Sequence, residues 1–195
     1  MPVSTDSVVL NNVNVTGNYT VNLPTGATGV TLFRLAIIPT PPRTITLSLP
    51  SGNTANPGLR VGDAGSATDD LILYSGAVLK NSSGAPTGNG VEVSSTTNGT
   101  VWLGNGARYI HNTARSTAGI VPRLSTAAGT ESGVFEYDLP GTASAAIDLN
   151  GRNYGSLTLT HTAGAATYTT TEEARGRCAR TSRSTRGHAH TRRMC

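Results

Sequence analysis

Apolar and polar residues alternate in short segments along most of the chain. In TITLSL, the apolar side chains of Ile45, Leu47 and Leu49 fall on one face and hydroxyl side chains fall on the other. Because successive side chains of a strand point to opposite faces, this pattern predicts short strands with one buried face. The same period of two recurs in the following segments: YTVNL at 19–23, GVEVS at 90–94, VFEYDL at 134–139, AIDLN at 146–150 and SLTLT at 156–160.

The segments between these predicted strands are rich in glycine, asparagine and proline. PTGATG at 24–29 and NSSGAPTGNG at 81–90 are examples, and these residue types favour tight turns. The most helix-like segment, LAIIPT at 35–40, is short and is interrupted by Pro39. We therefore expect an all-β protein.

Two all-β architectures fit this pattern. One is an antiparallel sandwich, and the other is a parallel β-helix in which each coil stacks on the next. The low content of charged (13%) and aromatic (5%) residues suits stacked ladders of Thr, Ser, Asn and aliphatic side chains. We find no strict repeat, so periodicity alone leaves both architectures open. We predict several coils of a right-handed parallel β-helix over residues 1–171, with the antiparallel β-sandwich as the alternative.

Basic residues are unevenly distributed along the chain. The net charge is +4, but residues 1–173 hold eight basic and eleven acidic residues and therefore carry −3. The other seven arginines and both cysteines, Cys178 and Cys195, lie in residues 174–195. The acidic, cysteine-free body therefore has neither a disulfide framework nor the positive charge typical of a nucleic-acid-binding domain.

Residues 172–195 do not continue the strand pattern, and we expect a disordered, arginine-rich tail. Its arginines could bind polyanions without specificity, so no specific nucleic-acid partner is predicted. A metal site of Cys178, His188, His190 and Cys195 is a second interpretation, although this spacing matches none of the usual zinc motifs. We favour a third interpretation, in which the tail derives from a shifted reading frame or a truncation.

Several segments resemble large secreted bacterial proteins with a β-helix fold. STDSVVLNNVNVTGNYTVNLP at 4–24 is similar to their opening coil. The segments 109–112, 135–137 and 154–159 (YIHN, FEY and YGSLTL) resemble recurring strands of adhesin-like surface proteins exported by the type IX secretion system. The resemblance covers residues 1–171 and implies a non-catalytic structural or adhesive segment of a secreted or cell-surface protein. Its implied partners are extracellular polysaccharide or neighbouring coils of a longer chain.

The chain departs from that family at both ends. MPVSTDSVV at 1–9 lacks the basic start and apolar core of a signal peptide, and a C-terminal sorting domain is missing. We therefore expect a fragment of a longer protein. No run of 18 apolar residues occurs, which predicts no membrane-spanning helix.

Three acidic residues in VGDAGSATDD form one candidate site. Asp63, Asp69 and Asp70 could bind calcium or act as general acid and base. The alternative is that these carboxylates cap turns through their own backbone. No cofactor is expected, with calcium as the one alternative if these aspartates bind it.

Two aromatic residues form a second candidate site. Val101 and Leu103 should point inward, which leaves Trp102 on the outer face, where an indole can stack on a sugar ring. Tyr154 in NGRNYG is a second candidate for carbohydrate stacking. For both, the alternative is a ring that covers a loop or the neighbouring coil.

No catalytic residue is predicted. His111 and His161 have no nucleophile or acid partner nearby in the sequence, so we expect no enzymatic activity. The alternative is a polysaccharide-binding or polysaccharide-cleaving β-helix module. That alternative requires carboxylates gathered with an arginine or an aromatic residue on one outer sheet.

Overall fold

The computed structural model describes residues 4–62, 69–84, 87–94, 100–124, 131–149, 153–162, 164–170, 180–185 and 188–193. These residues form short strands and one turn of 3-10 helix, η1 (Val121–Arg123). The strands are β1 (Ser7–Asn11), β2 (Tyr19–Asn22), β3 (Val30–Leu32), β4 (Arg34–Ile38), β5 (Ile45–Leu49), β6 (Leu59–Val61), β7 (Leu71–Leu73), β8 (Ala77–Asn81), β9 (Val91–Val93), β10 (Val101–Leu103), β11 (Arg108–His111), β12 (Val134–Asp138), β13 (Ser144–Ile147), β14 (Ser156–Thr160), β15 (Thr167–Thr170), β16 (Arg180–Thr185) and β17 (His188–Arg193).

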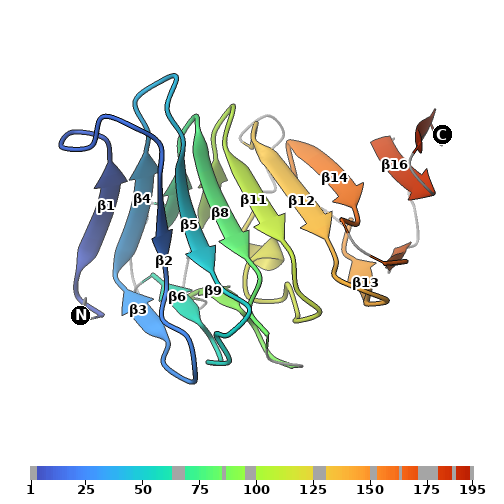
Figure 1. The fold of residues 1–195 in the computed structure, drawn as a ribbon, viewed down its shortest axis with the longest axis horizontal. Coiled ribbons are helices and arrows are strands. Elements are labelled where there is room, and N and C mark those ends of the chain that lie inside the picture. Colours follow the sequence, from blue (N-terminus) through green and yellow to red (C-terminus); the bar gives the residue numbers. More distant parts are fainter. Residues whose placement is uncertain are drawn as a thin grey trace.

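Most strands that follow one another in the chain enter different sheets, with β11 and β12 as an exception, and the strands from β1 to β15 pair in parallel with strands of neighbouring coils. β2, β5, β8, β11, β12 and β14 form the larger sheet, whose strands lie side by side in this order in Figure 1. β1, β4, β7 and β10 form a four-stranded sheet, β3, β6 and β9 form a three-stranded sheet, and β13 pairs with β15. The predicted parallel β-helix is confirmed, and the antiparallel sandwich is not.

Parallel in-register pairing stacks side chains of the same kind on one another. Leu47 pairs with Val21 and Leu79, and Phe135 pairs with Tyr109 and Leu157. Together these six side chains form one inward row across the larger sheet. β5 and β8 show the expected alternation, with every second residue buried. The core is therefore a stack of layers, each contributed by one coil.

The core changes from aliphatic to aromatic along the stack. Phe135 is fully buried, and its ring centroid lies 4.7 Å from that of Tyr109 and 5.2 Å from that of Tyr137. Tyr154 packs edge-on against Phe135 at 5.3 Å. Aromatic pairs at these separations add attraction to the burial of their area, so Phe135 is the centre of the C-terminal half of the core.

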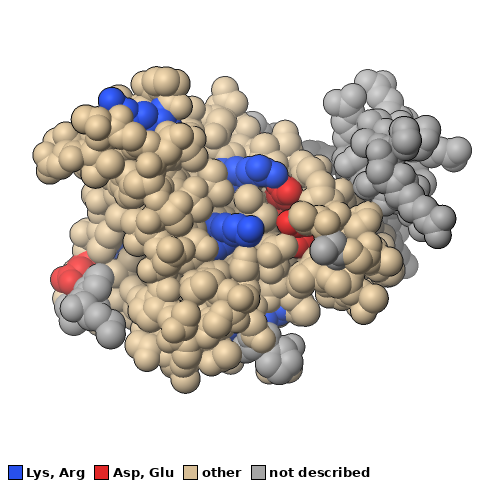
Figure 2. All heavy atoms as spheres, in the orientation of Figure 1, with Lys and Arg blue, Asp and Glu red and all other residues tan. Residues whose placement is uncertain are grey.

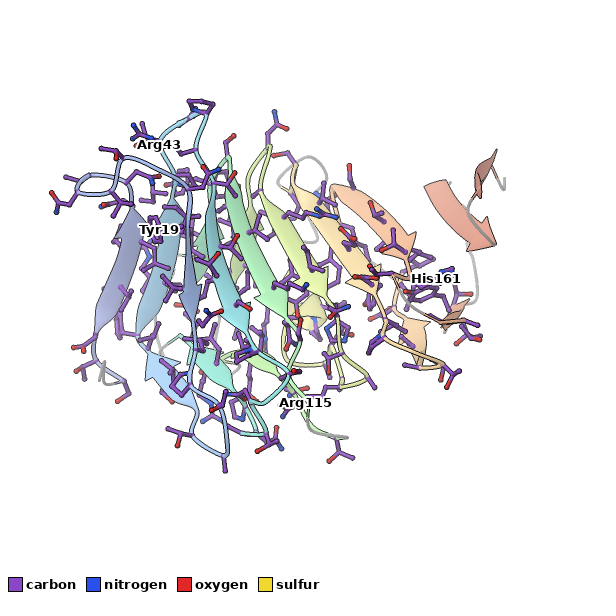
Figure 3. The ribbon with its side chains drawn as sticks, viewed as in Figure 1. Tyr19, Arg43, Arg115 and His161 are labelled. Carbon is purple, nitrogen blue, oxygen red and sulfur yellow. The ribbon has the colours of Figure 1, made fainter. Side chains whose placement is uncertain are left out.

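Polar side chains connect the coils at the corner between the larger and three-stranded sheets. The buried Asn53 donates from Nδ2 to the carbonyl oxygens of Pro24 (2.7 Å) and Thr28 (3.3 Å). Arg115, labelled in Figure 3, is 3% exposed, and its Nη1 donates to the carbonyl oxygen of Ala55 at 2.7 Å. These carbonyl oxygens lie outside the strands and have no partner from strand pairing, so the side chains satisfy their hydrogen-bonding capacity.

In the tail, the structure describes two strands where the sequence analysis expected disorder. β16 pairs with β17 in an antiparallel hairpin, unlike the parallel ladders of the body, and β16 lies beside β14. The RTSRST sequence of β16 contains two threonines, and threonine favours extended backbone. The proposed domain boundary, Cys178 and Cys195 lie outside the described residues, and the reading-frame hypothesis stays a prediction.

No helix in the described part of the chain has the length and apolar character needed to cross a membrane.

Candidate functional site

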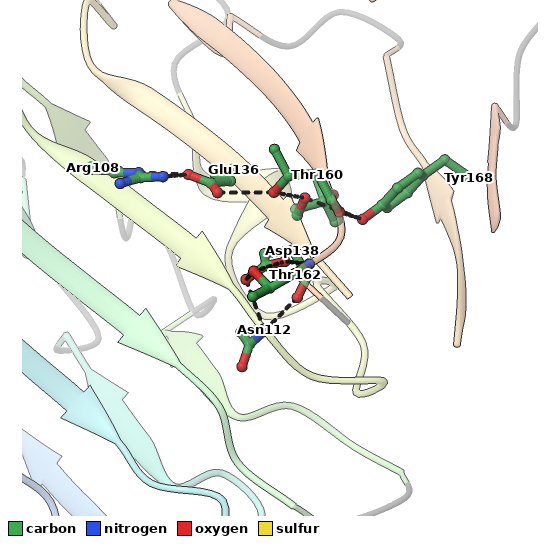
Figure 4. Close-up of polar contacts among 8 residues, drawn as sticks. Arg108, Asn112, Glu136, Asp138, Thr160, Thr162 and Tyr168 are labelled. Atoms are coloured by element: carbon green, nitrogen blue, oxygen red, sulfur yellow. Dashed lines mark hydrogen bonds and ion pairs between the residues drawn. The ribbon is translucent and has the colours of Figure 1, made fainter. Parts of the chain in front are cut away.

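The outward face of β11, β12 and β14 carries a connected group of charged and hydroxyl side chains (Figure 4). Glu136 and Asp138 occupy alternate positions of β12, where Glu136 follows the inward-pointing Phe135 and Asp138 follows the inward-pointing Tyr137. Because side chains alternate along a strand, both carboxylates belong to the outward face. Figure 2 shows basic and acidic side chains next to one another on this face, with a largely uncharged surface around them.

Both oxygens of the Glu136 carboxylate are engaged. Arg108 on the neighbouring strand donates from Nε to Oε2 at 2.5 Å, and its Nη2 forms an ion pair with the same oxygen. Thr160 donates from Oγ1 to Oε1 at 3.0 Å. The Arg108 side chain is 47% exposed whereas that of Glu136 is 6% exposed, so solvent screens one end of this pair and its contribution to stability is modest.

The Asp138 carboxylate connects three successive coils. Asn112, which follows β11, donates from Nδ2 to Oδ2 at 3.1 Å. Thr162, which follows β14, donates from its backbone nitrogen to Oδ1 at 2.7 Å and from Oγ1 to Oδ2 at 2.8 Å. Asp138 is buried, so these bonds replace the water that the carboxylate would otherwise need.

The spacing of the two carboxylates is compatible with acid–base chemistry, but both carboxylates are engaged by neighbouring side chains. Alternate residues of a strand lie roughly 7 Å apart, near the separation of about 6.5–9.5 Å used by inverting glycosidases. A substrate would have to displace Arg108, Asn112 or Thr162, because these residues already donate to the carboxylates. The arrangement therefore fastens coils together.

The structure describes two of the three predicted aspartates. Asp69 accepts a hydrogen bond from Thr100 Oγ1 at 2.6 Å, and Asp70 is 2% exposed with its carboxylate beside Gly62. Asp63 lies outside the described residues. Among the residues with described positions, no group of three His, Cys, Asp or Glu side chains is arranged to hold a metal ion.

The two predicted sugar-stacking residues have different environments. Trp102 is partly exposed on the outward face of β10, between the buried Val101 and Leu103, as the alternation predicts. Tyr154 is 7% exposed, packs against Phe135, and donates a short hydrogen bond to the carbonyl oxygen of Asp148. Tyr154 is thus a core residue that presents no exposed ring face, because its ring completes the aromatic cluster.

His111 is an interior residue. It is 1% exposed, and its Nε2 lies 2.9 Å from the carbonyl oxygen of Arg115, which accepts the ring proton. Burial lowers its pKa from 6.5 to about 4, and the hydrogen bond to Arg115 opposes the shift. The imidazole is therefore neutral and structural at neutral pH. His161 follows β14 at a partly exposed position (Figure 3).

Stability should fall between pH 6.5 and pH 4 because of His111. The unfolded chain binds a proton at the unperturbed pKa of this group, whereas the folded chain resists it until about pH 4. We expect the free energy of unfolding to be about 2 kcal/mol lower at pH 5 than at pH 7 from this group alone. Urea unfolding at pH 5 and pH 7 measures this difference in the free energy of unfolding. In His111→Gln the difference between the two pH values should be smaller by about 2 kcal/mol. An unchanged pH dependence in His111→Gln would contradict the assignment.

The sequence analysis missed the role of Arg108, Glu136 and Asp138. The signal was present in VFEYDL, where both acidic residues alternate with buried aromatic ones. What the sequence did not supply was the partner, because the number of residues between paired positions varies from coil to coil. Arg108 pairs in register with Val134, which places Glu136 two residues further along the adjacent strand.

Fold and surface together define an all-β protein of the parallel β-helix class whose described outward carboxylates on β12 are engaged within the chain. Comparison of the chain with protein-family models, with curated proteins and with solved structures gives no match. Strand pairing thus establishes the fold class, and the side chains are the basis for the functional proposal.

Proposed function

We propose that this chain is a non-catalytic structural or adhesive segment of a secreted or cell-surface protein. The observation that carries the proposal is the engagement of Glu136 and Asp138 by Arg108, Asn112, Thr160 and Thr162. Acidic groups bound in this way connect successive coils instead of facing a substrate. The resemblance of residues 1–171 to adhesin-like β-helix proteins supplies the cell-surface setting.

The shape of the molecule supports the same role. Parallel coils stacked through in-register ladders form an elongated body whose length grows with each coil. Such a body separates or presents other parts of a long chain, and its flat outward sheets provide area for adhesion. The proposed partners are extracellular polysaccharide and neighbouring coils of a longer protein.

A polysaccharide-cleaving module is the second candidate, because carboxylates and an arginine do share one outer sheet. Incubation of the purified chain with neutral and acidic polysaccharides, followed by measurement of reducing ends and chain length, separates the two. We expect no cleavage with any substrate. Cleavage that disappears in Glu136→Gln or Asp138→Asn, with the melting transition retained, would overturn the non-catalytic proposal.

A further inference from the structure

A second outward face, that of the four-stranded sheet, carries two neighbouring aromatic rings. Trp102 in β10 pairs in register with Ile72 in β7, and Tyr74 directly follows β7. The ring centroids of Tyr74 and Trp102 lie 5.1 Å apart with an interplanar angle of 70°. Tyr74 is 40% exposed and Trp102 is partly exposed, so both rings border solvent.

Gly104 determines how the indole lies. Position 104 is the next outward position after Trp102, and a Cβ placed there would be 2.7 Å from the indole ring. The indole therefore lies over the glycine along the strand. A larger residue at position 104 would displace it, so the glycine makes a broad aromatic surface possible.

A carboxylate and a hydroxyl group border this aromatic surface. Thr100 is the outward position before Trp102, roughly 7 Å along the strand, and its Oγ1 donates to Asp69 Oδ1 at 2.6 Å. Both Thr100 and Asp69 are partly exposed. Hydrogen-bonding groups beside an aromatic ring can orient a ligand that has both polar groups and an apolar face.

We propose that Tyr74, Trp102, Thr100 and Asp69 form a binding site for a neutral hexose unit of a polysaccharide. The C–H face of the sugar stacks on the indole and its hydroxyl groups donate to the Asp69 carboxylate. Charge selects the ligand class: the site's one charged group is a carboxylate, and residues 1–173 carry −3. Acidic polysaccharides are repelled by both.

This site deepens the adhesive role and rests on the proposed function. The test is affinity electrophoresis of the full chain through gels that contain β-glucan, galactan, mannan, polygalacturonate or alginate. We expect retardation by at least one neutral polysaccharide that depends on Trp102, whereas any retardation by the acidic ones, through the seven arginines of residues 174–195, should not change in Trp102→Leu. Trp102→Leu should weaken binding at least about tenfold, whereas Trp102→Phe, which keeps an aromatic plane, should retain most of it.

Asp69→Asn is the second variant and should also weaken binding, while Thr46→Ala, on the outward face of the larger sheet, is the matched control and should bind normally. Melting curves verify that each variant folds. Absence of retardation by every neutral polysaccharide in the unmodified chain, or equal retardation of folded Trp102→Leu by the neutral polysaccharides, would overturn the site. None of these results involves cleavage, which alone would overturn the non-catalytic role.

Discussion

Replacement of Phe135 by alanine is expected to lower the free energy of unfolding by about 3–5 kcal/mol. Phe135 is fully buried and its ring meets those of Tyr109, Tyr137 and Tyr154. The substitution removes transfer energy and aromatic attraction, and leaves a cavity that the rigid ladders on either side cannot close. Because domains are stable by only about 5–15 kcal/mol, this variant should approach the unfolding threshold at ambient temperature.

Urea unfolding followed by circular dichroism measures this effect. Val134→Ala is the matched control, since Val134 neighbours Phe135 on β12 but is half-buried on the outward face. We expect a loss of no more than about 1 kcal/mol for the control. Similar losses in the two variants would show that β12 does not present alternate faces to core and solvent.

Replacement of Gly84 by alanine is expected to cost about 3 kcal/mol through backbone contact between coils. A Cβ at this position would lie 2.1 Å from the backbone oxygen of Ser51, and the Gly84 nitrogen donates to the carbonyl oxygen of Asn53 at 3.0 Å. The added methyl group forces the two coils apart and strains that hydrogen bond. Unlike the end of a flexible side chain, a backbone oxygen in a turn between paired strands cannot move aside cheaply.

Gly17→Ala is the matched control, because a Cβ at Gly17 would meet nothing within 4 Å. It should leave stability unchanged or raise it by about 0.4–1 kcal/mol through the entropy of the unfolded chain. Both free energies come from the same urea titration. If Gly84→Ala were as stable as Gly17→Ala, the close approach of the two coils would be wrong.

Local alternation was enough to predict several of the strands and their inward faces, although AIDLN at 146–150 overlaps only the end of β13 (Ser144–Ile147). Ile45, Leu47 and Leu49 are buried as the pattern in TITLSL indicates, and Trp102 lies outward as VWL predicts. In these segments one face of the sheet is buried and the other borders solvent. The alternation of apolar and polar residues therefore shows which side chains point inward. The LAII part of LAIIPT also lies in a strand, β4, in which Leu35 and Ile37 are buried in the core and Ile38 is exposed.

Pairings between coils could not be predicted, because they depend on loop lengths that vary. The ion pair of Arg108 and Glu136 needs the register of β11 and β12, which no local pattern contains. Tyr154 was a candidate for carbohydrate stacking, with a ring that covers a loop or the neighbouring coil as the alternative, and it packs inside against the cluster around Phe135, which is assembled from several coils. The burial of Asp70 could not be predicted for the same reason, because its carboxylate lies beside Gly62, which follows β6.

Disulfide trapping tests the stacked-coil architecture most directly. Thr46 of β5 pairs in parallel register with Val78 of β8, which in turn pairs with Arg108 of β11. In a chain whose two native cysteines are replaced, Thr46→Cys with Val78→Cys should form a disulfide rapidly, because adjacent strands lie about 4.8 Å apart. Thr46→Cys with Arg108→Cys, two coils apart at about 10 Å, should not. Failure of the first pair, or equal oxidation of both pairs in the folded chain, would contradict the parallel β-helix.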